Sequence, residues 1–216
     1  MFNQAAFKMP TSPRLLFDLD ETIYMGDLVG IARDQLVKEG VVLSEYSGAD
    51  ASDYGFSNFP PVLRERVMKL FSDPFYACLN KYALPGIFPF LHYVCYKKFW
   101  KIGYVTSRPA NLEEYTNYVL YRDFPGITWE GRHFSNKANV TSPGVRKIDC
   151  IKDFKPTHFF DDHWDYCLEA VEAKVPNVFL VTNSHTGWNH KYIENGLYRS
   201  YNIIPIKSIL ELDLRS

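Results

Sequence analysis

The sequence predicts an α/β protein with a doubly wound parallel sheet. Five short apolar runs without a helical period, at residues 14–19, 101–106, 157–161, 177–182 and 203–206, are typical of buried strands. Helix-like stretches lie between them, at 86–99, 110–121, 146–154, 163–174 and 208–214. Strands that alternate with helices form βα units, which place helices on both faces of the sheet. The composition agrees, because 46% of the 216 residues are hydrophobic and 23% are charged, as in an ordinary globular protein.

One interval breaks the alternation of strands and helices. Residues 28–39 and 61–71 each show an amphipathic helical pattern, and no buried strand is evident between residues 28 and 84. Residues 44–60 are rich in Ser, Gly, Asp and aromatic residues, which favours an irregular loop. We therefore predict a small helical insertion at 28–84, set between core segments 1–27 and 85–216.

The charge balance and the cysteine spacing argue against a nucleic-acid-binding protein and against a zinc or iron–sulfur site. The 24 Lys and Arg and 25 Asp and Glu give a net charge of −1, which offers no basic track for a nucleic-acid backbone. The cysteines are far apart, without a CxxC pair, so we expect reduced and mostly buried thiols: Cys78, Cys95, Cys150 and Cys167. Without a signal-peptide pattern or a run of 18 apolar residues, we expect no membrane association and a cytoplasmic protein.

Two aspartates directly follow the first predicted strand. Asp18 and Asp20 are two residues apart, so they project to the same side if the strand continues. Two adjacent carboxylates repel each other unless a cation lies between them, and Mg²⁺ prefers such oxygen ligands. The alternative is that both residues merely cap a loop. An EF-hand is excluded, because a strand precedes the pair and Ile23 stands where that loop needs glycine.

Two further predicted strands also end in residues with hydroxyl or carboxylate side chains. Thr106 and Ser107 end the second strand, and Pro109 is placed to open a helix whose N-terminus can bind an anion. An ordinary helix start is the alternative there. The pair Asp161 and Asp162 leaves the third strand, which suits a metal ion or a solvated helix cap. Ligands of open α/β sheets bind at this edge.

A basic residue between these sites is a candidate for balancing anionic charge. Lys147 begins a short predicted helix before the third strand, and Lys137 and Lys152 compete with it. Lysines are usually solvated, so the choice depends on the order of the other motifs.

That order resembles the haloacid dehalogenase superfamily of phosphohydrolases. The superfamily pattern is DxDxT, then Thr or Ser, then Lys, then an acidic pair, and LLFDLDETIY, VTSRP, Lys147 and FFDD are similar to its four motifs. The match covers nearly the whole chain. Glu21 departs from the glycine common in DxDGT, and its side chain can point away from the site. The resemblance implies a Rossmann-like core with the insertion as a helical cap.

The resemblance also implies a role for each matching residue. Asp18 would be the nucleophile that forms an aspartyl-phosphate, and Asp20 the general acid and then the general base. Mg²⁺ would be held by Asp18, by the backbone carbonyl of Asp20 and by Asp162, with Asp161 nearby. Thr106 and Ser107 would bind phosphoryl oxygens, and Lys147 would balance their charge.

A finer resemblance concerns the substrate. Residues 158–191, with the Trp188-Asn189 turn, are similar to the 5'(3')-deoxyribonucleotidase family. This implies a 5'-nucleotidase that acts on (deoxy)ribonucleoside monophosphates. Aromatic residues of the cap would stack on the base, and the candidates are Tyr46, Phe56 and Phe75. Arg108 is expected near the phosphate or sugar, or in a salt bridge to the cap.

Other readings of the same motifs stay open. A phosphatase for another small phosphorylated metabolite or for a polynucleotide 3'-phosphate fits the motifs. A protein-serine phosphatase fits less well, because 83 residues separate Thr22 from Thr106 and a cap of that size would block an extended peptide. A nucleotide-binding or scaffold protein on the same fold is the non-enzymatic alternative. The oligomeric state is open, with a homodimer as one option.

Overall fold

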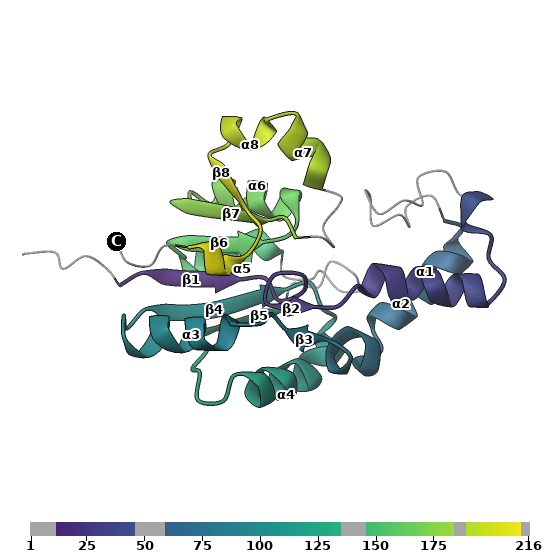
Figure 1. The fold of residues 1–216 in the computed structure, drawn as a ribbon, viewed down its shortest axis with the longest axis horizontal. Helices are drawn as coiled ribbons and strands as arrows, with labels where there is room; N and C mark the ends of the chain where they lie inside the picture. Colours follow the sequence, from purple (N-terminus) through teal and green to yellow (C-terminus); the bar gives the residue numbers. More distant parts are fainter. Residues whose placement is uncertain (1–11, 46–58, 135–145, 184–188, 213–216) are drawn as a thin grey trace, which may run out of the picture.

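The protein is an α/β structure built on a parallel sheet (Figure 1). The computed structural model describes residues 12–45, 59–134, 146–183 and 189–212. Within these residues, six strands form one sheet in the order β5-β4-β1-β6-β7-β8, and every neighbouring pair is parallel. The strands are β1 (Arg14–Phe17), β4 (Lys101–Thr106), β5 (Gly131–Phe134), β6 (His158–Asp161), β7 (Asn177–Val181) and β8 (Ile203–Ile206). The predicted fold class is therefore confirmed.

Side chains of the strands alternate between two hydrophobic clusters, one on each face of the sheet. Leu15 and Phe17 belong to one cluster, whereas Leu16 between them belongs to the other. The same alternation holds in β6, where Phe159 and Phe160 face opposite sides. This period of two is what a pleated strand imposes, and it fixes the register, because a slip of one residue would exchange the faces.

Four main helices cover the two faces. α3 (Ile87–Tyr96) and α4 (Glu113–Asp123), which follows the 3-10 turn η4 (Ala110–Leu112), pack against the first cluster. α5 (Lys147–Phe154) and α6 (Trp164–Glu172) pack against the second. Because the two clusters lie on opposite faces of the sheet, the two pairs of helices do as well. β1 lies in the middle, with β4 and β6 beside it, so their three carboxyl ends meet at one edge.

The helical insertion has a hydrophobic cluster of its own. α1 (Leu28–Lys38) and α2 (Pro61–Phe71) extend to one side of the sheet in Figure 1. Their apolar faces meet in a cluster that is separate from the main core: Ala32, Leu36, Phe59, Leu63 and Val67. Ala77 and Cys78 instead pack with the main core. The bounds of the insertion, 28–84, and its role as a cap stay predictions.

Several elements differ from the sequence prediction. The predicted helix 208–214 is only a 3-10 turn, η6 (Ile209–Glu211), and residues 213–216 lie outside the described part. Elements that were not predicted are the edge strand β5, the antiparallel pair β2 (Tyr24–Met25) and β3 (Tyr82–Ala83), the 3-10 turn η1 (Leu43–Glu45), the π-helical turn η3 (Phe75–Leu79), α7 (His190–Glu194) and α8 (Leu197–Ser200). Most of the predicted loop 44–60 lies outside the described residues.

All four cysteines are free thiols, and Cys78, Cys150 and Cys167 are buried. Among the described residues, none of the helices has the length and apolar content that crossing a bilayer would require.

Candidate active site

The candidate active site lies where β1, β4 and β6 end. Asp18 directly follows β1, and its backbone N–H donates to the carbonyl oxygen of Phe160 at 2.8 Å, which continues the ladder beyond the strand. Asp161 is the last residue of β6, and Thr106 is the last residue of β4. The parallel sheet therefore brings together the three strand ends on which the sequence placed its motifs.

Lys147 connects two of these strand ends. From the first residue of α5, its Nζ lies 2.7 Å from Asp18 Oδ1 and 2.7 Å from Asp161 Oδ2, and its side chain is 1% exposed. Lys152 on the same helix is exposed, and Lys137 lies outside the described residues. Of the three lysines that competed in the sequence, Lys147 is thus the one that the structure places beside Asp18.

The buried carboxylates carry more negative charge than Lys147 can balance. Burial raises the pKa of Asp18 to about 7, although the charge of Lys147 opposes the shift. Burial likewise raises the pKa of Asp161 against the effect of Lys147. The pKa of Asp162 lies well above its usual value, because burial is reinforced by the charges of Asp161 and Asp18. An additional cation would relieve these shifts.

Asp20 faces a different environment from Asp18. The guanidinium of Arg108 donates to both of its carboxylate oxygens, at 2.9 and 2.7 Å, and Lys81 Nζ lies 2.8 Å from Oδ1. Burial alone would raise the pKa of Asp20, but the charges of Arg108 and then Lys81 outweigh it and hold the pKa well below its usual value. Asp20 is therefore an anion in this arrangement.

The hydroxyl residues after β4 line the same site. Thr106 is buried, and its Oγ1 accepts a hydrogen bond from the backbone N–H of Arg108 at 3.2 Å. Ser107 Oγ donates to the hydroxyl of Tyr166 at 3.0 Å. The ring of Tyr166 lies 4.0 Å from Lys147 Nζ, so α6 contributes an aromatic face to the lysine. The predicted phosphate-binding residues Thr106, Ser107 and Lys147 thus lie around one region.

Glu21 lies close enough to the acidic group for its charge to act on Asp162. It is 8% exposed, and its charge contributes to the raised pKa of Asp162; that its side chain points away from the site stays a prediction. Its φ of 57° is the left-handed conformation that favours glycine, which is the residue common at this position in the resembling motif. This chain therefore keeps the turn and adds a carboxylate.

Two asparagines after β7 hold the acidic loops. Asn183 Nδ2 donates to the carbonyl oxygen of Glu21 at 2.8 Å. Asn189 is fully buried, and its Nδ2 donates to the carbonyl oxygen of Asp162 at 2.6 Å and to that of Val181 at 3.4 Å. The loops that carry Asp18 and Asp162 are thus tied to the end of β7.

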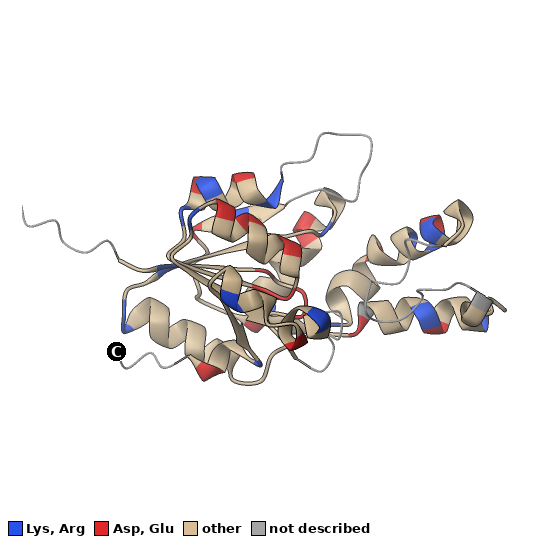
Figure 2. Ribbon diagram, turned by 90° about the horizontal axis from the view of Figure 1, so that it is seen from above, with Lys and Arg blue, Asp and Glu red and all other residues tan. Residues whose placement is uncertain are grey.

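The donor chemistry of the site fits one divalent cation. If all are ionised, five carboxylates exceed three cationic side chains by two negative charges: Asp18, Asp20, Glu21, Asp161 and Asp162 against Lys81, Arg108 and Lys147. Figure 2 shows acidic segments in the middle of the molecule, between the sheet and the projecting helices. In the described part of the chain, no group of three His, Cys, Asp or Glu side chains is arranged to hold a metal ion. Mg²⁺ does not need one, because it usually keeps several waters and takes one or two carboxylates.

Of the four predicted substrate residues, the structure describes Arg108 and Phe75. Arg108 lies beside Asp20: its buried guanidinium forms an ion pair with Asp20 and also donates to Thr116 Oγ1 and Cys78 Sγ, at 3.1 and 3.4 Å, and its contact with the phosphate or sugar stays a prediction. Phe75 lies on η3, 54% exposed, with its ring edge-on to that of Tyr76. Tyr46 and Phe56 lie outside the described residues, so their roles stay predictions.

Sequence reasoning assigned no catalytic role to Lys81, Tyr166 and Asn189. No local motif marks Lys81 or Tyr166, since each reaches the site only through the fold. Asn189 was noticed as part of a turn, but its contact with Asp162 could not be inferred from sequence spacing.

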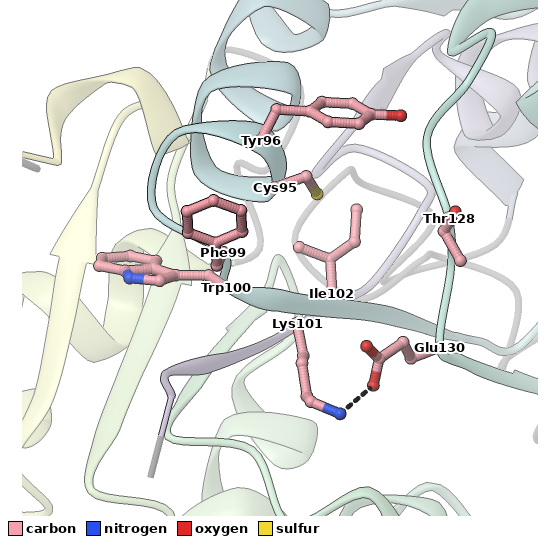
Figure 3. A pocket seen from close by; sticks show the side chains of 8 residues that line it. All are labelled: Cys95, Tyr96, Phe99, Trp100, Lys101, Ile102, Thr128 and Glu130. Atoms are coloured by element: carbon pink, nitrogen blue, oxygen red, sulfur yellow. Dashed lines mark ion pairs between the residues drawn. The ribbon is translucent and has the colours of Figure 1, made fainter. Parts of the chain in front are cut away.

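A separate cavity of about 270 Å³ lies at the opposite end of β4. Figure 3 shows Phe99 and Trp100 beside it, with the Lys101–Glu130 ion pair at one edge. Lys101 begins β4 and Thr106 ends it, so this cavity and the acidic site lie roughly 17 Å apart along the strand. It takes no part in the site described above.

Comparison with solved structures identifies the fold. A haloacid dehalogenase-like hydrolase from Bacteroides fragilis matches with a TM-score of 0.60 and 14% identity, over 92% of this chain and 98% of that one. A haloacid dehalogenase-like family protein from Streptococcus pneumoniae matches with a TM-score of 0.57 and 14% identity, over 91% and 94%. A phosphonoacetaldehyde hydrolase like protein from Oleispira antarctica matches with a TM-score of 0.59 and 12% identity, over 99% and 94%.

The chain therefore has the fold of haloacid dehalogenase-like hydrolases, as its motifs indicated. No family model and no curated protein matches the sequence. At these identities the likeness establishes the fold, and the activity has to be argued from the site.

Proposed function

We propose that this protein is a Mg²⁺-dependent phosphomonoesterase in which Asp18 is the nucleophile. The observation that carries the proposal is the Lys147 bridge between Asp18 and Asp161, with Asp162 beside them. A buried lysine shared by two carboxylates at the end of the central strand aligns one of them and counters the charge of an arriving phosphoryl group. The fold of the structural neighbours supports a hydrolase.

The residues present suit a two-step transfer. Without substrate, Arg108 and Lys81 hold Asp20 as an anion, and the negative charge of an arriving phosphate ester would favour uptake of a proton by its carboxylate. In the first step, a carboxylate oxygen of Asp18 attacks phosphorus, the bond from phosphorus to the leaving oxygen breaks, and Asp20 gives that proton to the leaving oxygen. In the second step, Asp20 accepts a proton from the attacking water, the aspartyl–phosphate bond breaks, and inorganic phosphate leaves. Thr106 and Ser107 orient the phosphoryl oxygens, and Lys147 balances their charge.

Asp18, Asp162 and the backbone carbonyl of Asp20 would hold the Mg²⁺. Asp161 already accepts from Lys147 and from the backbone N–H of His163, at 2.7 and 2.9 Å, which favours Asp162 as the second carboxylate ligand. When bound, the ion neutralises negative charge so that an anionic nucleophile can approach an anionic ester.

For the substrate, we propose a (deoxy)ribonucleoside monophosphate. The support is the resemblance of residues 158–191 to the 5'(3')-deoxyribonucleotidase family, together with the insertion that precedes the second motif. Because Arg108 is engaged by Asp20, recognition of the sugar or base would depend on the insertion.

A substrate panel tests both levels of the proposal. Nucleoside monophosphates, sugar phosphates and phosphopeptides are assayed for phosphate release with Mg²⁺ and with EDTA. We expect Mg²⁺-dependent release, fastest from nucleoside monophosphates. Equal rates on all three classes would remove the nucleotidase proposal, and an absence of release from every ester would remove the phosphatase proposal.

A further inference from the structure

The carboxylate of Asp20 is bound to the segment through which the chain returns from the insertion. We define this return segment as residues 75–81, which comprise η3, Asn80 and Lys81. Lys81 Nζ lies 2.8 Å from Asp20 Oδ1, and the lysine side chain is 3% exposed. Arg108, the other partner of Asp20, donates to Cys78 Sγ in the same segment at 3.4 Å. Two routes thus connect the predicted general acid to the return segment.

The backbone is shaped to let Lys81 reach Asp20. β2 and β3 pair antiparallel, with Met25 opposite Tyr82, which places Gly26 opposite Lys81. A Cβ at Gly26 would lie 3.0 Å from Lys81 Cγ, so the lysine stem passes where only glycine leaves comfortable room. The buried Lys81 side chain therefore passes close to Gly26, and a side chain at position 26 would force it to shift.

The charge of Asp20 by itself does not require Lys81, although Lys81 also balances part of the surplus of carboxylates in the site. Arg108 alone matches the charge of Asp20 and binds both of its oxygens. Lys81 adds a second buried cation to a carboxylate that already has a bidentate partner, and desolvating an ammonium group is costly. Besides its charge, Lys81 contacts Oδ1 of Asp20 from the return segment, while Arg108 contacts the carboxylate from the loop after β4.

We propose that Lys81 is a positioning residue, which orients the carboxylate of Asp20 for proton transfer to the leaving oxygen and couples that orientation to the insertion. The inference rests on the proposed function. It extends that function by assigning the acid–base step a partner in the return segment, for which the resembling motifs provide no counterpart.

The consequence is a dependence on the leaving group. Proton transfer matters for phenyl phosphate, whose leaving group is basic, and matters much less for p-nitrophenyl phosphate, whose leaving group departs as a stable anion. Positioned general acids contribute about 10²–10⁴-fold, so partial loss of orientation in Lys81→Met should lower kcat/KM for phenyl phosphate about tenfold or more. The ratio kcat/KM is compared because it reports on formation of the aspartyl-phosphate, whereas hydrolysis of this intermediate is the same step for both esters. On p-nitrophenyl phosphate the loss should be under about threefold.

A double-mutant cycle separates positioning from a merely structural role. We would measure kcat and KM on both esters for Lys81→Met, Asp20→Asn and the combined variant, with Lys101→Met as the control. Lys101 also forms an ion pair, with Glu130, but at the far end of β4. If Lys81 acts through Asp20, its substitution has no further effect in the Asp20→Asn background. If Lys81→Met does not fold, Gly26→Ala provides a second test, because the added methyl displaces the lysine stem and should give a smaller change of the same kind.

The outcomes distinguish the inference from the proposed function. A loss of kcat/KM in Lys81→Met that is equal on both esters, or that persists in the Asp20→Asn background, overturns the positioning role while the phosphatase stands. A rise in KM of the same size for both esters, with unchanged kcat, also overturns it, because Lys81 would then bind substrate directly. An absence of wild-type turnover on both esters overturns the proposed function and the inference together.

Discussion

Replacing Lys147 by methionine tests the electrostatics of the site. The substitution keeps an unbranched side chain of similar length and removes the charge that lies 2.7 Å from both Asp18 and Asp161. Removal of one partner from a buried ion pair typically costs about 3–5 kcal/mol, because the remaining charge is left uncompensated. We expect a loss of about 3 kcal/mol in the free energy of unfolding at pH 8 without divalent ions.

The loss should depend on pH in a defined direction. The pKa of Asp18 is already raised to about 7 by burial, even beside Lys147, and the pKa of Asp161 is also raised. At pH 5 Asp18 is largely protonated in the folded protein, so Lys147 has less charge to compensate. The destabilisation should therefore fall below about 1 kcal/mol at pH 5.

Thermal and urea unfolding in EDTA measure this difference. For a chain of this size, about 3 kcal/mol corresponds to roughly 6–12 °C in Tm at pH 8. Lys152→Met on the same helix is the matched control, because Lys152 is exposed, and it should change stability by less than about 0.5 kcal/mol. A Lys147→Met loss that is the same at pH 5 and pH 8, or no larger than that of the control, would refute the reasoning.

Three other predictions follow from the same structure. In EDTA, the wild-type Tm should fall from pH 5 to pH 8, because the pKa of Asp18 is about 7 in the folded state, above its unfolded value, so that its ionisation opposes folding. Saturating Mg²⁺ should make the Tm nearly independent of pH. A Tm that does not change with pH in EDTA would contradict the raised pKa of Asp18. Asn189→Ala should raise the Mg²⁺ concentration needed for half-maximal stabilisation about tenfold, because the substitution removes the hydrogen bond to the Asp162 carbonyl oxygen. The control Asn177→Ala, at the other end of β7, should leave that concentration unchanged. Equal shifts in both variants would argue against a positioning role of Asn189. Leu36→Ala should lower the stability of the insertion, measured by calorimetry, by about 3 kcal/mol and leave turnover of p-nitrophenyl phosphate near wild type. If turnover falls together with stability, the insertion does not unfold separately from the core.

Much of the sheet could be predicted because its strands are buried on both faces. Such strands are continuous apolar runs, and RLLF and NVFLV show this directly. β5, with the sequence GRHF, pairs on one edge only and is partly polar, so it gives no such signal. The two-residue strands β2 and β3 are defined by pairing between segments more than 50 residues apart, which no local pattern reveals.

The residues of the candidate site likewise divide into those that the sequence could predict and those that it could not. Asp18, Thr106 and the Asp161–Asp162 pair could be predicted because each stands at the end of an apolar strand. The partner of Arg108 could not, since its hydrogen bonds with Asp20 join residues 88 positions apart. Lys81 carries no motif, and only the folded β2–β3 pair brings it to Asp20. Side chains that act through long-range ion pairs therefore need coordinates.

The most direct test of the account is whether phosphate becomes covalently attached to Asp18 during turnover. Wild-type protein and Asp18→Asn, both with Mg²⁺, would be quenched in acid after milliseconds with ³²P-labelled substrate, and the labelled peptide would be mapped. The account predicts a hydroxylamine-sensitive phosphoryl group on the peptide that contains Asp18, and no label or turnover in Asp18→Asn. Label on another residue, or wild-type turnover by Asp18→Asn, would contradict it.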